Sequence, residues 1–98
     1  MAVKISARHT HISDATKEHI EKAGAKLDQF FDRIISCEVV VSQERSRTEA
    51  EFIVKVPNQT LVASAHTPGD NLYKSIDEAH SRMVNQLKKY HDKTVEHR

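Results

Sequence analysis

Three consecutive stretches of alternating side chains constrain the fold of this chain more than any other feature. They span residues 36–44, 48–56 and 59–65, and only "RSR" at 45–47 and "PN" at 57–58 separate them. Every second residue in them is apolar: Cys37, Val39 and Val41, then Ala50, Phe52, Val54 and Val56, then Leu61, Ala63 and Ala65. This period of two, broken by short turns, predicts an antiparallel meander with one apolar face.

A fourth strand is expected near the start of the chain. "VKISAR" at 3–8 also alternates, with Val3, Ile5 and Ala7 on one side. A helix-length segment separates it from the strand at 36–44, so these two strands can pair in parallel through a right-handed crossover. Because each strand has one apolar face, helices need to cover only one side of the sheet.

The crossover segment carries the signals of a helix. Ser13 is the expected N-cap, and Asp14 is favourable in the first turn. Gly24 inside this helix costs about 1 kcal/mol relative to alanine, and close packing against the sheet or another helix is the expected reason for it. The apolar residues recur at helical spacing to about residue 33, and they are Ile20, Ala23, Leu27, Phe30, Phe31 and Ile34.

A second, longer helix is expected after Pro68 and Gly69, with Asp70 as its N-cap and an end near residue 94. Its apolar stripe consists of Leu72, Ile76, Ala79, Met83, Leu87 and Tyr90, with Tyr73 and His80 at the edge. The predicted fold class is α+β in the order β-α-β-β-β-α. We expect a four-stranded mixed sheet with two helices packed on one face, resembling a double-stranded RNA-binding domain.

The composition favours one soluble domain over residues 1–98, since the chain is 38% hydrophobic and 30% charged. No stretch approaches the ~20 apolar residues of a membrane span, and no signal-peptide pattern opens the sequence. The single Cys37 has no internal disulfide partner. These features predict a cytoplasmic protein. Without a glycine-rich phosphate loop or an acid pair, no enzyme activity, cofactor or small-molecule substrate is expected.

The distribution of charge is more informative than the formal net charge of +1. Lys22, Lys26 and Arg33 form one stripe on the first helix, and Arg82, Lys89 and Lys93 form one on the second, at about 100° per residue. If the helices pack side by side, the stripes can flank a shared groove that follows phosphates. Glu18 and Glu78 interrupt the stripes, and a solvated helix face is the alternative.

The uncovered face of the sheet should attract polyanions less than the helices do. It is expected to present Glu38, Glu49 and Glu51 together with Lys4 and Lys55, which makes it mixed to acidic.

Several motifs, taken in order, resemble the ribosome hibernation-promoting factor family. They are "AKLDQFFDRI", "LVASA", the "DNLYKSID" that opens the second helix, and "QLKKYHDK". This family includes ribosome-associated translation inhibitors, also called sigma-54 modulation proteins. The resemblance covers nearly the whole chain, which stops just after the second helix and so looks like the short form.

The resemblance implies a function on the ribosome. Family members bind the small ribosomal subunit in the channel for mRNA and tRNA under stress or in stationary phase, inhibit translation and preserve inactive ribosomes. By this resemblance, contacts with rRNA would come from Lys22, Lys26, Arg33, Arg82, Lys88, Lys89 and Lys93. Short forms are associated with ribosome dimers formed with a separate ribosome modulation factor. The free chain is expected to be a monomer with no membrane partner.

A general double-stranded RNA-binding module is the alternative function. Such modules bind phosphates with a lysine cluster at the start of the final helix. Here the corresponding segment reads "GDNLYKSIDE", which is acidic apart from Lys74.

Other residues have a structural and a functional interpretation. His9 and His11 form an H-x-H that suits an exposed turn better than a metal site. His80 suits a packed or surface position better than catalysis, and Cys37 suits a buried small residue better than a nucleophile. Tyr73 and Tyr90 are expected at the edge of the core, with stacking on bases as the alternative.

Overall fold

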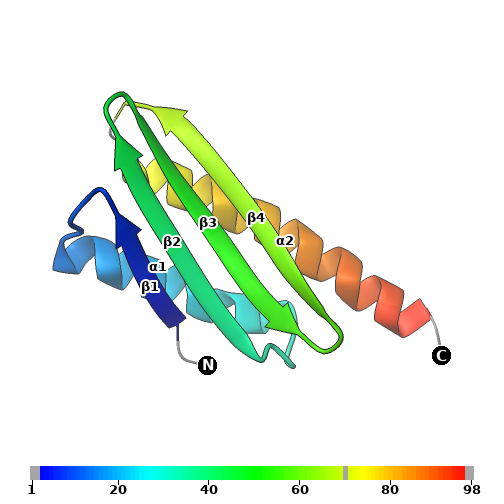
Figure 1. Cartoon of the computed structure of the whole chain (residues 1–98). Coiled ribbons are helices and arrows are strands. Elements are labelled where there is room, and N and C mark those ends of the chain that lie inside the picture. The colour runs from blue at the N-terminus through cyan, green and yellow to red at the C-terminus, as the bar shows by residue number, and fades with distance from the viewer. Residues whose placement is uncertain (1–2, 70, 97–98) are drawn as a thin grey trace.

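The computed structural model describes residues 3–69 and 71–96, the last five of these in backbone only. Within them, four strands form one sheet: β1 (Val3–Arg8), β2 (Ser36–Glu44), β3 (Arg47–Val56) and β4 (Gln59–Pro68). The helical elements are α1 (Asp14–Lys26), the short 3-10 helix η1 (Leu27–Gln29) and α2 (Leu72–Glu96). Figure 1 shows both long helices on the same face of the sheet, which confirms the predicted order and layers.

The strands lie side by side in chain order, β1-β2-β3-β4. β1 pairs with β2 in parallel, whereas β2–β3 and β3–β4 are antiparallel, as the turn lengths predicted. The register aligns the apolar residues of neighbouring strands: Val39 lies opposite Phe52, which lies opposite Ala63. A shift by one residue would turn these side chains to solvent, so burial of one face fixes the pairing.

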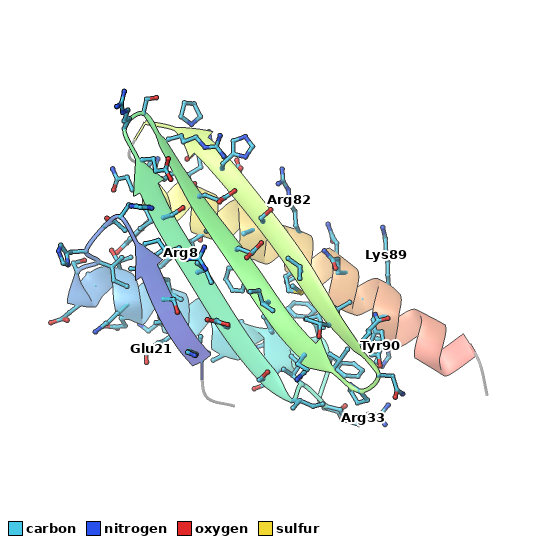
Figure 2. The ribbon with its side chains drawn as sticks, in the orientation of Figure 1. Arg8, Glu21, Arg33, Arg82, Lys89 and Tyr90 are labelled. Carbon is cyan, nitrogen blue, oxygen red and sulfur yellow. The ribbon has the colours of Figure 1, made fainter. Side chains whose placement is uncertain are left out.

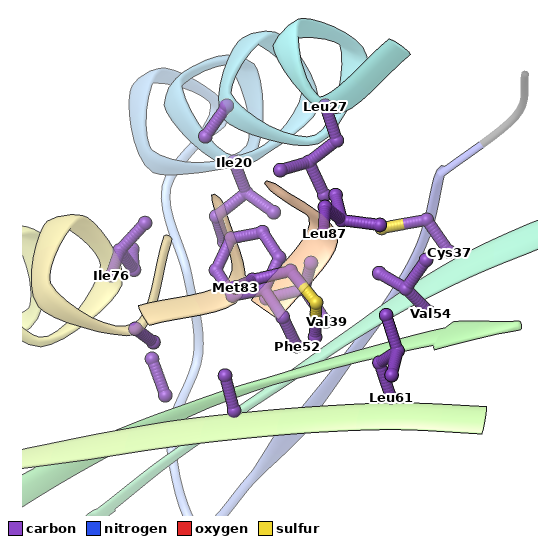
Figure 3. Close-up of a cluster of buried hydrophobic side chains, with 14 of the residues drawn as sticks. Ile20, Leu27, Cys37, Val39, Phe52, Val54, Leu61, Ile76, Met83 and Leu87 are labelled. Carbon is purple, nitrogen blue, oxygen red and sulfur yellow. The ribbon is translucent and has the colours of Figure 1, made fainter. Parts of the chain in front are cut away.

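The core lies between the sheet and the helices, as Figure 3 shows. All ten apolar residues predicted for the meander are buried. From the helices come Ile20, Leu27, Ile76, Met83 and Leu87, each fully buried. The edge strand β1 is less covered, because Val3 and Ile5 are half-buried and Ala7 is exposed.

The start of α1 agrees with the prediction and its end does not. Ser13 Oγ accepts a hydrogen bond from the Thr16 backbone N–H at 3.1 Å, which is an N-cap. α1 ends at Lys26 rather than near residue 33, and η1 follows. Leu27 and Phe31 stay buried across this tighter turn. Helical spacing of apolar residues therefore continues past the end of the helix, and neither glycine nor proline marks that end.

The start of α2 is capped by Asn71, whose Oδ1 accepts from the Lys74 backbone N–H at 3.2 Å. Asp70, the predicted cap, lies outside the described residues.

Buried hydroxyls of Thr48, Thr67 and Ser75 lie within 3.0 Å of one another. They join the first turn of α2 to β3 and β4. Each buried hydroxyl therefore has hydrogen-bond partners within the core.

Gly24 packs against the sheet as predicted. A Cβ atom at this position would lie 2.7 Å from Cγ2 of Val3. Glycine therefore permits the close approach of α1 to β1.

The opposite face of the sheet is open to solvent. Its predicted charged residues alternate with the buried ones, and Lys4 and Lys55 are exposed. Apolar side chains also reach this face, because Val62 is 47% exposed and Ile53 is half-buried. Among the described residues, no helix combines the length and hydrophobicity that crossing a membrane requires.

Candidate nucleic-acid interface

Lys22 and Lys26 are exposed one turn apart on α1. Lys22 Nζ lies 2.9 Å from Glu18 Oε1. This hydrogen bond and the charge of the partner hold the pKa of Glu18 below its usual value and that of Lys22 above it. Because both side chains are solvated, such a pair is weak, and a phosphate can compete with Glu18 for the ammonium.

Arg33 is not part of a helical stripe, which corrects the prediction. Since α1 ends at Lys26, Arg33 lies in the turn before β2. Its guanidinium carbon lies 5.7 Å from the centroid of the Phe31 ring. Phe31 packs edge-on against Tyr90 at 5.1 Å, and Figure 2 shows Arg33 beside Tyr90 at the end of the sheet. Arg33 is exposed, and the contact recorded for its guanidinium is with the Phe31 ring rather than with α1.

The basic residues of α2 divide between its two sides. Lys88 Nζ lies 5.4 Å from the ring centroid of Phe30, the residue that follows η1. Arg82 Nη1 instead donates a 2.6 Å hydrogen bond to the Ser64 carbonyl of β4. Figure 2 shows Arg82 and Lys89 projecting past the outer edge of β4. Lys93 lies outside the residues whose side chains are described.

The expected groove between two basic stripes is therefore wrong. Asp77 faces α1, because its Oδ1 lies 2.8 Å from Nε2 of His19. Arg82 follows Asp77 by five residues, which is about 140° around the helix. It faces β4 instead. The exposed side of α2 separates the basic residues of α1 from Arg82 and Lys89.

The structure nevertheless places a stretch of positive charge along α2. Residues 79–91 contain Arg82, Lys88 and Lys89 and no carboxylate, and all three basic residues are exposed. Together with Lys22 and Lys26 they lie on the helical layer, opposite the sheet face that carries Glu38, Glu49 and Glu51. The surface available to a polyanion is the outside of the two helices rather than a groove between them.

Arg82 and Gln86 also have a structural role that sequence reasoning missed. Gln86 Nε2 donates to the Val62 carbonyl at 2.7 Å, one strand repeat away from the Arg82–Ser64 bond. These bonds satisfy outward carbonyls of the edge strand β4. Occupied edge groups disfavour pairing with another chain. The available sequence signal was a pair of long hydrogen-bond donors, Arg82 and Gln86, spaced i, i+4 on the helix that follows the last strand.

The remaining candidates show no catalytic or metal-binding arrangement. His9 Nε2 lies 3.9 Å from Glu44 Oε1, and both side chains are exposed. No group of three metal-binding side chains occurs in the described part of the chain. Cys37 is buried, and burial, with a contribution from the charge of Asp28, raises the pKa of its thiol to about 11. A thiol in this state is a poor nucleophile.

His80 and Tyr90 are packed residues. The His80 ring contacts Phe52 edge-on at 5.8 Å, and burial lowers the pKa of its imidazole against an opposing effect of the Ala23 backbone. Its Nε2 is buried and has no hydrogen-bond partner among the described residues. Tyr90 is half-buried, and its hydroxyl donates to the Pro57 carbonyl at 2.6 Å. Tyr73 differs from both, since it is 42% exposed.

Comparison with known protein families shows which family this chain belongs to. The sequence pattern of the family described as "Sigma 54 modulation protein / S30EA ribosomal protein" matches residues 3–95. This chain belongs to that family. The resemblance inferred from the sequence motifs is thereby confirmed.

Named relatives in this family span most or all of the chain. A ribosome hibernation promoting factor of Escherichia coli K12 is 31% identical over 97 residues, which are 99% of this chain and 100% of that protein. One from Azotobacter vinelandii is 29% identical over 96 residues, 98% of this chain and 88% of the relative.

Solved structures of similar proteins share the fold. A ribosomal subunit interface protein from Coxiella burnetii matches with a TM-score of 0.85 and 25% identity over 94% of this chain and 99% of that one. The N-terminal domain of Thermus thermophilus Protein Y matches with a TM-score of 0.79 and 30% identity. The match covers 89% of this chain and 94% of that one. The mixed sheet with two helices on one face therefore matches the fold of these two proteins.

Proposed function

We propose that this chain is a ribosome hibernation factor. It binds the small ribosomal subunit in the channel for mRNA and tRNA, inhibits translation and stabilises inactive ribosomes under stress or in stationary phase. The observation that carries this proposal is the match to the S30EA family over residues 3–95. The full-length relatives named ribosome hibernation promoting factor support it further.

The proposed binding surface is the outside of the helical layer. Lys22, Lys26, Lys88 and Lys89 are exposed there, and basic side chains that replace counterions on rRNA phosphates supply most of the affinity of such contacts. Arg33 and Arg82 add charge at the two margins of the layer, although each already has a partner within the protein. Lys93 completes the proposed set.

The protein acts in the cytoplasm as a single, non-enzymatic domain and is a monomer when free. Its proposed partners are the small subunit with its rRNA and a separate ribosome modulation factor. A general affinity for RNA duplexes is not expected, because the start of α2 offers Lys74 beside Asp77 and Glu78 rather than a lysine cluster.

Sedimentation with purified ribosomal subunits tests the proposal. The chain should sediment with small subunits and whole ribosomes, and not with isolated large subunits or with a plain RNA duplex at the same salt concentration. Equal sedimentation with both subunits would indicate general polyanion affinity and would reject the specific function.

Competition tests the position on the small subunit. Small subunits that already hold mRNA and initiator tRNA should bind the chain more weakly than empty ones, and excess chain should inhibit translation in vitro. Undiminished binding to filled subunits would place the site outside the channel.

A further inference from the structure

Tyr73 is an aromatic residue that the fold leaves open to solvent. The residue is 42% exposed although it lies on the first turn of α2, next to the core. One face of the ring stacks on the imidazole of His19 from α1, with 4.4 Å between the ring centroids and 2° between the ring planes. Because His19 covers one face, the exposed area belongs to the edge and the other face.

The stacked pair is held in a fixed position. Nε2 of His19 lies 2.8 Å from Oδ1 of Asp77, one turn after Tyr73. This hydrogen bond orients the imidazole, and the imidazole in turn supports the tyrosine ring. A ring that is ordered before binding loses less conformational entropy when a ligand stacks on it.

Surface hollows lie on both sides of Tyr73. A small one of about 260 Å³ is lined by Tyr73 and by α1 residues Ala15, Glu18, His19 and Lys22. A wider, shallow one of about 590 Å³ runs along α2 from Asn71 and Tyr73 to Arg82 and Asn85. A flat ring placed against Tyr73 therefore has room on the exposed surface.

The charges around Tyr73 favour an uncharged ring over a phosphate. Lys22 and Lys74 flank the tyrosine, whereas Glu18, Asp77 and Glu78 also line the hollows. This nearly balanced set does not attract a phosphate strongly. The two lysines are nonetheless placed to contact the backbone of a nucleotide whose base reaches the tyrosine.

We propose that Tyr73, supported by His19, is a stacking platform for an unpaired base of ribosomal RNA. This inference rests on the proposed function, because it assigns a base contact within the same helical surface. RNA-binding proteins recognise splayed bases by stacking them on aromatic side chains. Such a stack tolerates any base, since every base has a π-face.

Two substitutions at one position separate stacking from other roles. With purified small subunits, Tyr73→Leu should raise the Kd about tenfold, as loss of one base stack does. Tyr73→Phe keeps the ring and should bind within about twofold of the unaltered chain. The dependence of log affinity on log salt should stay the same in both, because no phosphate contact is lost. Lys22→Met should instead reduce that slope by ~1.

Binding is measured at a temperature where circular dichroism shows all variants to be fully folded. Ultraviolet crosslinking of the unaltered chain to small subunits, followed by mass spectrometry, then identifies the neighbour of Tyr73. A crosslink to an rRNA nucleotide is expected. A crosslink from Tyr73 to a ribosomal protein would overturn the inference in favour of a protein contact.

The outcomes distinguish this inference from the proposed function. If the unaltered chain binds small subunits and Tyr73→Leu binds equally well, the stacking platform is wrong and the proposed function stands. If the unaltered chain does not bind small subunits, both fail.

Discussion

The Cys37 thiol illustrates how burial controls chemistry at a single residue. Burial raises its pKa to about 11, so at pH 8 almost none of it is the reactive thiolate. We predict that Ellman's reagent modifies native protein only at the rate at which the chain opens, and modifies it at once in denaturant. Rapid modification of the native protein would contradict the buried position.

Gly24 and Val3 should show a coupled effect on stability. Gly24→Ala alone forces a Cβ to within 2.7 Å of Val3, and such overpacking typically costs about 1–3 kcal/mol. In a Val3→Ala background the obstacle is gone. The same substitution should then stabilise α1 by up to about 1 kcal/mol through helix propensity. Urea unfolding of the unaltered chain and the three variants measures this coupling, and additive effects would contradict it.

His80 should make the protein less stable in acid. Burial is the main cause that lowers its pKa from 6.5; Lys26 and His19 lower it further, while the Ala23 hydrogen bond and Asp77 oppose the shift. Between the lowered pKa and 6.5, the unfolded chain binds a proton that the native chain does not. Stability therefore falls as the pH drops through this window.

The comparison with His80→Leu isolates this contribution. We expect the urea midpoint of the unaltered chain to fall between pH 7.5 and pH 5.5 by more than that of the variant. An identical fall in both proteins would show that other groups cause the acid sensitivity.

Residue roles were predictable where they depend on local sequence. Ser13 was predictable as a cap because the contact is made three residues away. Arg82 was not, because its partner Ser64 belongs to a strand that only the tertiary fold brings close. The stacking of His19 on Tyr73 was also invisible in the sequence, since it needs both helices in place.

At the scale of elements, α2 both completes the fold and carries charge. Its donors Arg82 and Gln86 occupy carbonyls of β4, whereas Lys89 has no such partner among the described contacts. Arg82→Met should therefore destabilise the protein by about 1 kcal/mol, the usual net value of one hydrogen bond. Lys89→Met should leave the unfolding midpoint nearly unchanged.

In ribosome binding, Lys89→Met should have a larger effect than Arg82→Met. Lys89→Met should reduce the slope of log affinity against log salt by ~1, as loss of one phosphate contact does. Arg82→Met should change the slope less, since its guanidinium is engaged with Ser64. A larger change for Arg82 would show that it leaves β4 to bind RNA.

The elements themselves were largely predictable from periodicity. The strand pattern predicted all four strands and their pairing, because alternation and short turns are local properties with one consistent topology. The end of α1 was misplaced, since η1 keeps Leu27 and Phe31 buried without a glycine or proline as a stop signal. That error placed Arg33 on the helix, whereas it lies in the turn before β2.

At the scale of the whole molecule, the two faces differ in the charged residues that they carry. One face of the sheet is covered by α1 and α2, whose exposed surfaces carry Lys22, Lys26, Lys88 and Lys89. The other face carries the carboxylates Glu38, Glu49 and Glu51. We propose that the chain binds the small ribosomal subunit through its helical layer.

Measurement of the Kd of Lys89→Glu and of Lys55→Glu for purified small subunits distinguishes binding through the helical layer from binding through the open sheet. Both substitutions change the net charge by the same amount at an exposed lysine, one on α2 and one on the open face of β3. Lys89→Glu should raise the Kd about tenfold or more, because it removes a phosphate contact and adds repulsion. Lys55→Glu should leave it within about twofold. Equal losses for the two variants would contradict binding through the helical layer.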